Sequence, residues 1–93
     1  MGKRMCGMRF VSMVKFKKKP KDVVSENVKM IEEESKKGIK FLSINWTLGR
    51  YDAVAIFEAP NEKEAMQMAI RRADILAMET MVAIPAEDAR KLV

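Results

Sequence analysis

Apolar and polar residues alternate with a period of two in four stretches of this chain, and such alternation predicts β-strands. The four predicted strands cover residues 8–16, 39–47, 51–58 and 75–84. The third strand is the clearest, because Gly49 gives the backbone freedom of a tight turn before it and Pro60, which lacks a backbone donor, follows it. A turn at residues 48–50 therefore joins the second and third strands into an antiparallel hairpin.

Two longer intervals between the strands have apolar residues at helical spacing. The first helix is predicted to begin at Pro20 or Asp22 and to end at Lys37, with Gly38 as its stop signal. The second helix opens at Asn61, whose side chain is suited to capping a helix start. The side chains expected to face the sheet in the first helix are Val24, Val28 and Ile31, flanked by Val23 and Met30. In the second helix they are Met66, Ala69, Ile70 and Ala73.

The order strand, helix, strand, strand, helix, strand predicts an α+β fold of the ferredoxin-like plait type, βαββαβ. In this plait a four-stranded antiparallel sheet carries both helices on one face, and a short C-terminal helix follows at residues 86–92. We expect residues 8–93 to form this single domain. Residues 1–7 show no periodicity and are interpreted as a disordered leader, so that Met8 is as good a candidate for the natural start as Met1.

One face of such a sheet has no helix over it. If Leu42, Ile44, Trp46, Val54 and Ile56 meet the helices, alternation assigns to the open face Ser12, Phe41, Ser43, Asn45, Tyr51, Ala53, Ala55, Phe57, Glu79, Met81 and Ala83. The facing of residues 8–16 is not fixed, because both of their faces are apolar. This open set is too apolar for water, and it predicts a homodimer, or a higher homo-oligomer, whose sheets pack face to face.

Small and polar members of the open set predict a small-molecule pocket between the two sheets. Asn45 and Glu79 are its polar candidates. The alternative for Glu79 is an ion pair with a Lys or Arg at the edge of the dimer.

Composition agrees with a small globular domain. The 93 residues are 48% apolar and 33% charged, and no apolar run approaches the ~20 residues of a membrane span. The single cysteine, Cys6, excludes an intrachain disulfide, and the first residues lack the apolar centre of a secretory signal. A cytoplasmic location is therefore expected.

The net charge of +5 is an N-terminal feature, because residues 1–21 contain eight basic residues and no acidic one. Its densest part comprises Lys15, Lys17, Lys18, Lys19 and Lys21. We interpret this run as a solvated loop, since only Phe16 interrupts it; the alternative is weak, non-specific binding of nucleic acid through phosphate contacts. The acidic run at residues 32–34 is likewise interpreted as a solvated helix face.

Two segments carry a family resemblance. Residues 47–60, TLGRYDAVAIFEAP, and residues 78–84, METMVAI, resemble the GYD-domain family, small stand-alone proteins without an assigned activity. The core of the signature is Gly49, Tyr51 and Asp52. The match spans nearly all of residues 8–93.

The same Gly-x-Tyr-Asp strand, with Glu79 and Thr80, also resembles the effector-binding domain of leucine-responsive transcription regulators. In that family the plait dimerises and binds amino acids between subunits. The resemblance implies a ligand-sensing or assembly module with Gly49, Tyr51, Asp52, Glu79 and Thr80 as its site positions. The alternative for Tyr51 and Asp52 is a hairpin end held together by hydrogen bonds.

The rival class is an enzyme. Some dimeric plaits are cofactor-free monooxygenases that oxidise aromatic substrates, and Asn45, Trp46 and Tyr51 are residue types found in such sites. Alternation places Trp46 on the face opposite to Asn45, however, and the chain has no histidine, glycine-rich phosphate loop or cysteine pair. We therefore expect neither cofactor nor metal, and we favour a binding module over an enzyme.

Overall fold

The structure is a computed structural model of the 93-residue chain, and it describes residues 7–93. Its elements follow the predicted order: β1 (Met8–Phe16), α1 (Pro20–Ser35), β2 (Lys40–Trp46), β3 (Ala53–Ala59), α2 (Glu62–Arg71) and β4 (Leu76–Val82). A tail helix α3 (Ala86–Ala89) follows and continues as the 3-10 turn η1 (Arg90–Leu92). The predicted leader lies, except for Gly7, outside the described residues.

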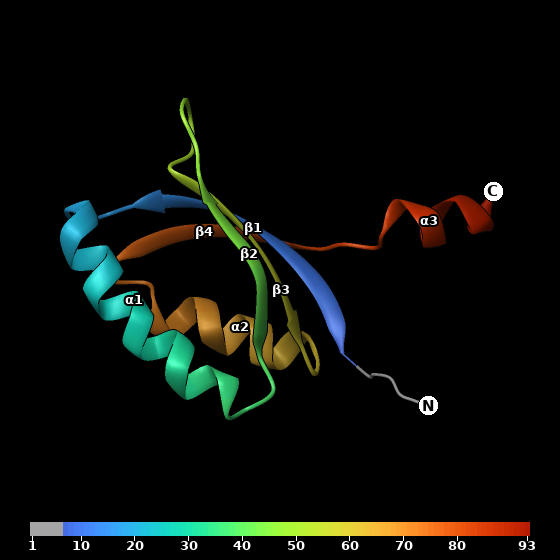
Figure 1. Ribbon diagram of the computed structural model, residues 1–93, viewed down its shortest axis with the longest axis horizontal. Coiled ribbons are helices and arrows are strands. Elements are labelled where there is room, and N and C mark those ends of the chain that lie inside the picture. The colour runs from blue at the N-terminus through green and yellow to red at the C-terminus, as the bar shows by residue number, and fades with distance from the viewer. Residues whose placement is uncertain (1–6) are drawn as a thin grey trace.

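The four strands form one antiparallel sheet in the order β2-β3-β1-β4. Both α1 and α2 lie on one side of this sheet, and the tail with α3 extends away from the body (Figure 1). The predicted α+β class, the four-stranded antiparallel sheet and the short C-terminal helix are confirmed.

The helix ends agree with their sequence signals. Pro20 occupies the first turn of α1, and Gly38, at φ 87°, follows its end in a conformation that favours glycine. Asn61 Oδ1 accepts a hydrogen bond of 2.9 Å from the backbone N–H of Glu64, which caps α2 as predicted. The β2–β3 hairpin is also confirmed, but β3 begins at Ala53, so the connection is longer than the three-residue turn that we predicted.

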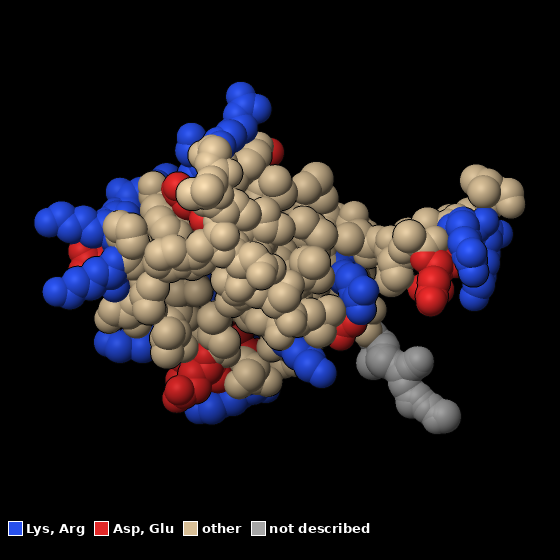
Figure 2. Space-filling view, turned by 45° about the horizontal axis from the view of Figure 1, so that its top comes forward, with Lys and Arg blue, Asp and Glu red and all other residues tan. Residues whose placement is uncertain are grey.

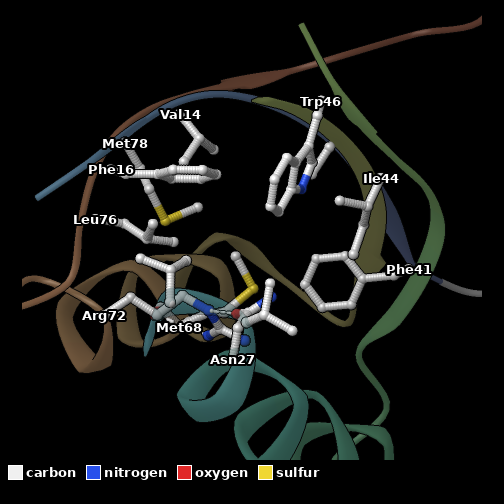
Figure 3. Close-up of a pocket in the computed structure, with 13 residues that line it drawn as sticks. Val14, Phe16, Asn27, Phe41, Ile44, Trp46, Met68, Arg72, Leu76 and Met78 are labelled. Carbon is white, nitrogen blue, oxygen red and sulfur yellow. Dashed lines mark hydrogen bonds between the residues drawn. The ribbon is translucent and has the colours of Figure 1, made fainter. Parts of the chain in front are cut away.

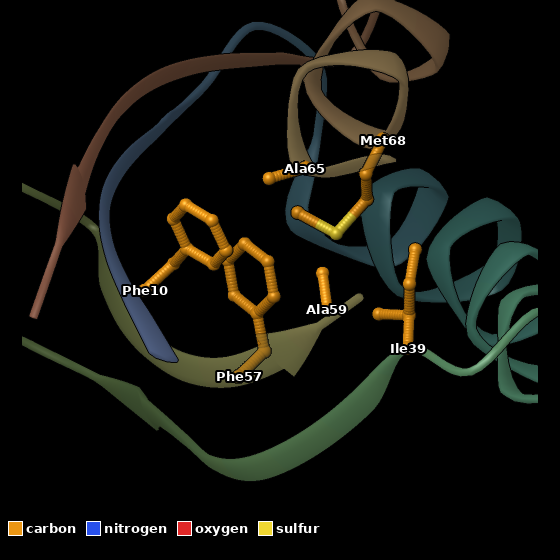
Figure 4. Close-up of a cluster of buried hydrophobic side chains, with 6 residues drawn as sticks. All are labelled: Phe10, Ile39, Phe57, Ala59, Ala65 and Met68. Carbon is orange, nitrogen blue, oxygen red and sulfur yellow. The ribbon is translucent and has the colours of Figure 1, made fainter. Parts of the chain in front are cut away.

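The largest part of the core lies between the sheet and α2. Phe10 of β1 and Phe57 of β3 stack with ring centroids 5.4 Å apart, and Met68 of α2 is fully buried near them (Figure 4). A second buried cluster gathers at the other end of the sheet and comprises Val14, Val23, Ala53, Ile75 and Leu76.

The predicted facing of β3 is wrong. Ala53, Ala55 and Phe57 are buried on the helix side, whereas Val54 and Ile56 lie half-buried on the open side. Both alternating sets of this strand are apolar, so alternation alone does not decide which set faces the helices. The small side chains of Ala53 and Ala55 leave room for side chains of the helices. This is the physical reason why this set of β3, and not Val54 and Ile56, faces the helices.

A bulge changes the facing of β2. The register of β2 on β3 shifts between Phe41 and Ser43, which leaves Leu42 as the extra residue. Phe41 therefore lies on the helix side together with Ile44 and Trp46. The prediction for Ile44 and Trp46 is confirmed, the prediction for Phe41 is wrong, and Leu42 remains 39% exposed.

The predicted buried stripes of both helices are rotated from the observed ones. Val24 and Val28 of α1 are exposed, and so are Met66 and Ile70 of α2. The buried residues are Val23 and Glu34 in α1, and Ala65 and Met68 in α2 with Arg72 directly after it. Two core positions are occupied by polar side chains, Glu34 in α1 and Arg72 directly after α2. A search for apolar residues at helical spacing therefore did not find the buried faces.

Candidate functional site

Tyr51 and Glu79 meet across the open side of the sheet. The Tyr51 hydroxyl lies 3.1 Å from each carboxylate oxygen of Glu79. Tyr51 stands just before β3 and Glu79 lies in β4, with β1 between them, so the tyrosine side chain reaches across β1. The hydrogen bond to Glu79 raises the pKa of Tyr51 above its usual value of about 10, and burial and the charge of Glu79 act in the same direction.

Asp52 holds two strands together. Its carboxylate Oδ2 accepts a hydrogen bond of 2.8 Å from the backbone N–H of Phe16, and its own backbone N–H donates to the carbonyl of Val14. Its carbonyl also accepts from the backbone N–H of Thr47, within the hairpin connection. Asp52 therefore fixes the end of β1 against the β2–β3 hairpin, which is the hydrogen-bonded hairpin end considered as the alternative above.

Gly49 and Asn45 do not join the Tyr51–Glu79 pair. Gly49 lies in the hairpin connection at φ 101°, and no atom lies within 4 Å of the place a Cβ would take. Asn45 lies on β2, which is the sheet edge opposite to β4. Its nearest polar partner is the hydroxyl of Ser43, at 3.5 Å.

Thr80 faces the interior. Its hydroxyl makes a hydrogen bond of 2.7 Å with the hydroxyl of Ser12, which is fully buried on the helix side. The placement of Ser12 on the open face is therefore wrong, and Thr80 and Glu79 point to opposite sides of the sheet. Of the predicted site residues, the structure brings only Tyr51 and Glu79 into direct contact.

A buried polar network, which the sequence analysis missed, joins α1 to the end of α2. The Arg72 guanidinium donates hydrogen bonds of 2.6 Å to both carboxylate oxygens of Glu34, and its Nε donates to Asn27 Oδ1 at 2.8 Å. Arg72 and Glu34 are each 1% exposed. The interpretation of the acidic run as solvated is wrong for Glu34, although Glu32 and Glu33 are exposed.

A hollow of about 60 Å³ lies between α1, α2 and the helix side of the sheet. Phe16 and Trp46 lie on its sheet side, and we call the region beside the exposed Trp46 its mouth (Figure 3). Asn27 and Arg72 lie on its helix side, which we call its floor. Phe41, Ile44 and Met78 are among the apolar side chains of its walls. Trp46 and Tyr51, two of the residues considered for a monooxygenase, do not share this hollow, because Tyr51 lies on the open side of the sheet.

The basic run is divided by the fold. Lys15 lies in β1 opposite Ala77, and Lys17 Nζ donates to the carbonyl of Ala73 at 2.7 Å. Lys18, Lys19 and Lys21 are exposed where α1 begins. Figure 2 shows Lys and Arg gathered at that end of the molecule. Weak nucleic-acid binding by this run remains a prediction.

Comparisons with known proteins identify one relationship. A family model described as the GYD domain matches residues 10–93. No curated protein matches the chain. Within residues 7–93, no helix is long and apolar enough to cross a membrane, and no three acidic or cysteine side chains gather to hold a metal ion. The family match covers nearly the whole chain and confirms the resemblance found in the sequence.

Proposed function

This chain belongs to the GYD domain family, and we propose that it acts as a homodimeric module that binds or senses a small molecule. We also assign its sheet and helices to the ferredoxin-like plait, an assignment supported by the strand order β2-β3-β1-β4 with α1 and α2 on one side. The observation that carries the homodimer is the apolar face of the sheet that no element of residues 7–93 covers.

This open face has an apolar centre. The register places Ile56, Val11 and Met81 in one row across β3, β1 and β4. In the next row Val54 and Met13 lie side by side, and Glu79 of β4 stands at the end of that row. Ion-pairing residues lie beyond these rows, where Arg9 and Glu58 approach to 3.4 Å. A contiguous apolar patch with a charged border is typical of a protein–protein interface. In Figure 2, a broad area without charge occupies the middle of the view.

A second copy of the chain is the occupant that fits this face best. Two identical apolar faces related by a two-fold axis each cover the other, so neither copy needs a different partner. Four strands of seven or more residues form a face of roughly 23 by 19 Å, which is about 440 Å² of flat area. A stable interface buries about 800 Å² on each partner, so further contacts must contribute.

The C-terminal tail can supply these contacts. Ile84 and Leu92 are more than half exposed, and α3 has only four residues before the turn η1. A helix this short is not stable in water unless it packs on something, because isolated helices below about 12 residues are marginal. The tail leaves the body beside the sheet (Figure 1), where a second copy on the open face would lie within its reach.

Size-exclusion chromatography with light scattering tests the dimer. We expect the wild type to have the mass of two chains and Val54→Lys to have the mass of one, because the lysine puts a charge in the centre of the interface. Ile70→Lys is the matched control: it adds the same charge at an exposed position of α2, on the other side of the sheet. Circular dichroism verifies that both variants fold. A monomeric wild type, or a Val54→Lys protein that stays dimeric, would contradict the proposal.

A further inference from the structure

Three large apolar side chains that line the hollow on the helix side of the sheet are exposed, and they mark its mouth. Ile44 and Trp46 of β2 are 41% and 58% exposed, and Val24 of α1 is 44% exposed. Large apolar side chains are unfavourable in water, so their concentration around one opening is informative. The mouth is apolar on both sides, and a ligand that entered there would cover these side chains.

The walls are suited to a flat apolar group. Phe16 and Trp46 approach edge to face, with ring centroids 5.2 Å apart, at the mouth of the hollow. Met78 and Leu76 line the same space (Figure 3). Aromatic rings prefer edge-to-face and offset contacts with other rings, and methionine sulfur also makes favourable contacts with them.

The size of the hollow limits the ligand. Its volume of about 60 Å³ is less than half of a cavity that holds benzene, which is about 150 Å³. A single ring therefore fits only in part, and the remainder of the ring stays in the mouth beside Trp46. A compound with two fused rings would require the helices to separate.

The floor offers unused hydrogen-bond donors. Asn27 Oδ1 accepts from Arg72 Nε, and this fixes the amide so that Nδ2 is directed elsewhere. Within residues 7–93, Asn27 Nδ2 has no hydrogen-bond partner. Arg72 uses four of its five N–H groups, on Asn27, on both oxygens of Glu34 and on the carbonyl of Met68. The remaining N–H belongs to a side chain that is 1% exposed.

The charge balance of the floor favours an acceptor with negative charge. Two guanidinium groups, those of Arg71 and Arg72, share the single carboxylate of Glu34. One positive charge is therefore not neutralised within this group. A ligand oxygen that carries negative charge gains from the free donors, whereas the field of the excess charge is weakened because Arg71 is one-third exposed and does not line the hollow.

We propose that this hollow is a binding site for a single-ring aromatic acid, whose ring packs at Trp46 and Met78 and whose carboxylate accepts from the amide of Asn27. This inference rests on the small-molecule part of the proposed function and is independent of the dimer. It assigns the ligand site to the helix side of the sheet, away from Tyr51 and Glu79.

Trp46 is the only tryptophan of the chain, so its fluorescence reports on the mouth of the hollow. Benzoate is the first probe, and toluene is the matched probe without an oxygen. We expect benzoate to change the Trp46 emission with a saturable dependence on concentration, and toluene to bind more weakly by about tenfold or more, because it cannot accept a hydrogen bond. A wild type whose emission does not change with benzoate would overturn the proposal.

Asn27→Asp is the decisive variant, because it keeps the oxygen that accepts from Arg72, replaces the Nδ2 donor with a second acceptor and adds a negative charge, and both changes oppose a bound carboxylate. We expect it to weaken benzoate by about tenfold or more and to leave toluene unchanged. A variant that lost both probes equally would indicate a structural effect and would count against the proposed contact. Thermal melting followed by circular dichroism verifies the fold.

Two α1 variants locate the site. Val24→Phe fills the mouth and should abolish the benzoate response, whereas Val28→Phe, one helical turn further on and not part of the lining, should retain it. Equal responses in the two variants would place benzoate elsewhere and overturn the inference. The mass measurement separates the two proposals: a dimer that does not bind benzoate contradicts only this site, and a monomer that binds it contradicts only the dimer.

Discussion

The carboxylate of Glu34 and the guanidinium of Arg72 are joined by two hydrogen bonds of 2.6 Å while both side chains are 1% exposed. Glu34 lies near the end of α1 and Arg72 directly follows α2, so this pair holds the two helices in register. Removing two charges from water is costly, and the pair is favourable only while each partner has the other. The pair therefore fixes the position of α1 relative to the end of α2, and it also shapes the floor of the hollow.

Replacing one partner of this pair should be strongly destabilising. We expect Glu34→Gln to lower the free energy of unfolding by about 3–5 kcal/mol, because the buried guanidinium then lacks its counter-charge. Urea unfolding followed by circular dichroism measures the loss. The control is Glu33→Gln, which makes the same change at an exposed neighbour and should alter stability by less than about 0.5 kcal/mol.

The double variant Glu34→Leu with Arg72→Met separates charge from packing. Replacing a buried ion pair by apolar residues of similar size is often neutral or stabilising. We therefore expect the double variant to recover most of the stability lost in Glu34→Gln. A double variant at least as unstable as the single one would show that the network contributes more than charge compensation.

Asp52 gives a second prediction, on the attachment of β1 to the hairpin. Asp52→Ala removes the acceptor of the Phe16 backbone N–H and should lower the free energy of unfolding by about 1.5–3 kcal/mol. Asp52→Asn keeps a side-chain oxygen and should lose less. Asp74→Ala removes an exposed carboxylate from the turn after α2 and is the control for the change in net charge. Equal stability of the two alanine variants in urea unfolding would contradict the assigned contact.

Gly49 gives a third prediction, which concerns the backbone alone. Its φ of 101° is unfavourable for any residue with a Cβ, although no atom lies within 4 Å of the place that the Cβ would take. Gly49→Ala should therefore cost about 1–2 kcal/mol of unfolding free energy. Gly49→Asn should cost less, because asparagine tolerates positive φ better than alanine does. An alanine variant as stable as the wild type in urea would contradict this account of the turn.

Local signals in the sequence were sufficient to predict the elements. The positions of Pro20, Gly38 and Asn61 predicted helix ends because each acts through its own backbone or its nearest neighbours. The hairpin was predicted for the same reason. The GYD signature is now partly explained in structural terms, since Gly49 permits the turn and Asp52 binds the end of β1.

Facing and burial were predicted less well because they depend on contacts between distant segments. The two faces of β3 are similarly apolar, so the side chains of α1 and α2 that pack on the strand decide which face is buried. The bulge at Leu42 has no local signature, yet it moves Phe41 to the other face. Glu34 is solvated in an isolated helix and becomes buried only when Arg72 approaches. The sequence did contain a signal for this buried ion pair: Glu34 stands at a position with the spacing of the core, and two adjacent arginines, Arg71 and Arg72, occur elsewhere in the chain.

The contact between Tyr51 and Glu79 makes a prediction about pH. The carboxylate raises the pKa of the phenol, so the neutral tyrosine is favoured in the folded protein, and this stabilisation is present below about pH 10 and lost as pH rises through the raised pKa. Tyr51 is the only tyrosine of the chain, so ultraviolet absorbance of the phenolate follows it directly. We expect a midpoint above about 10 in the wild type and a lower one in Glu79→Gln, which removes the charge of the acceptor. Glu87→Gln in the exposed tail, which changes the net charge by the same amount, should leave the midpoint unchanged. If Glu79→Gln titrates like the wild type, Tyr51 and Glu79 are not in contact in solution, and the open face of the sheet is arranged differently from the one described.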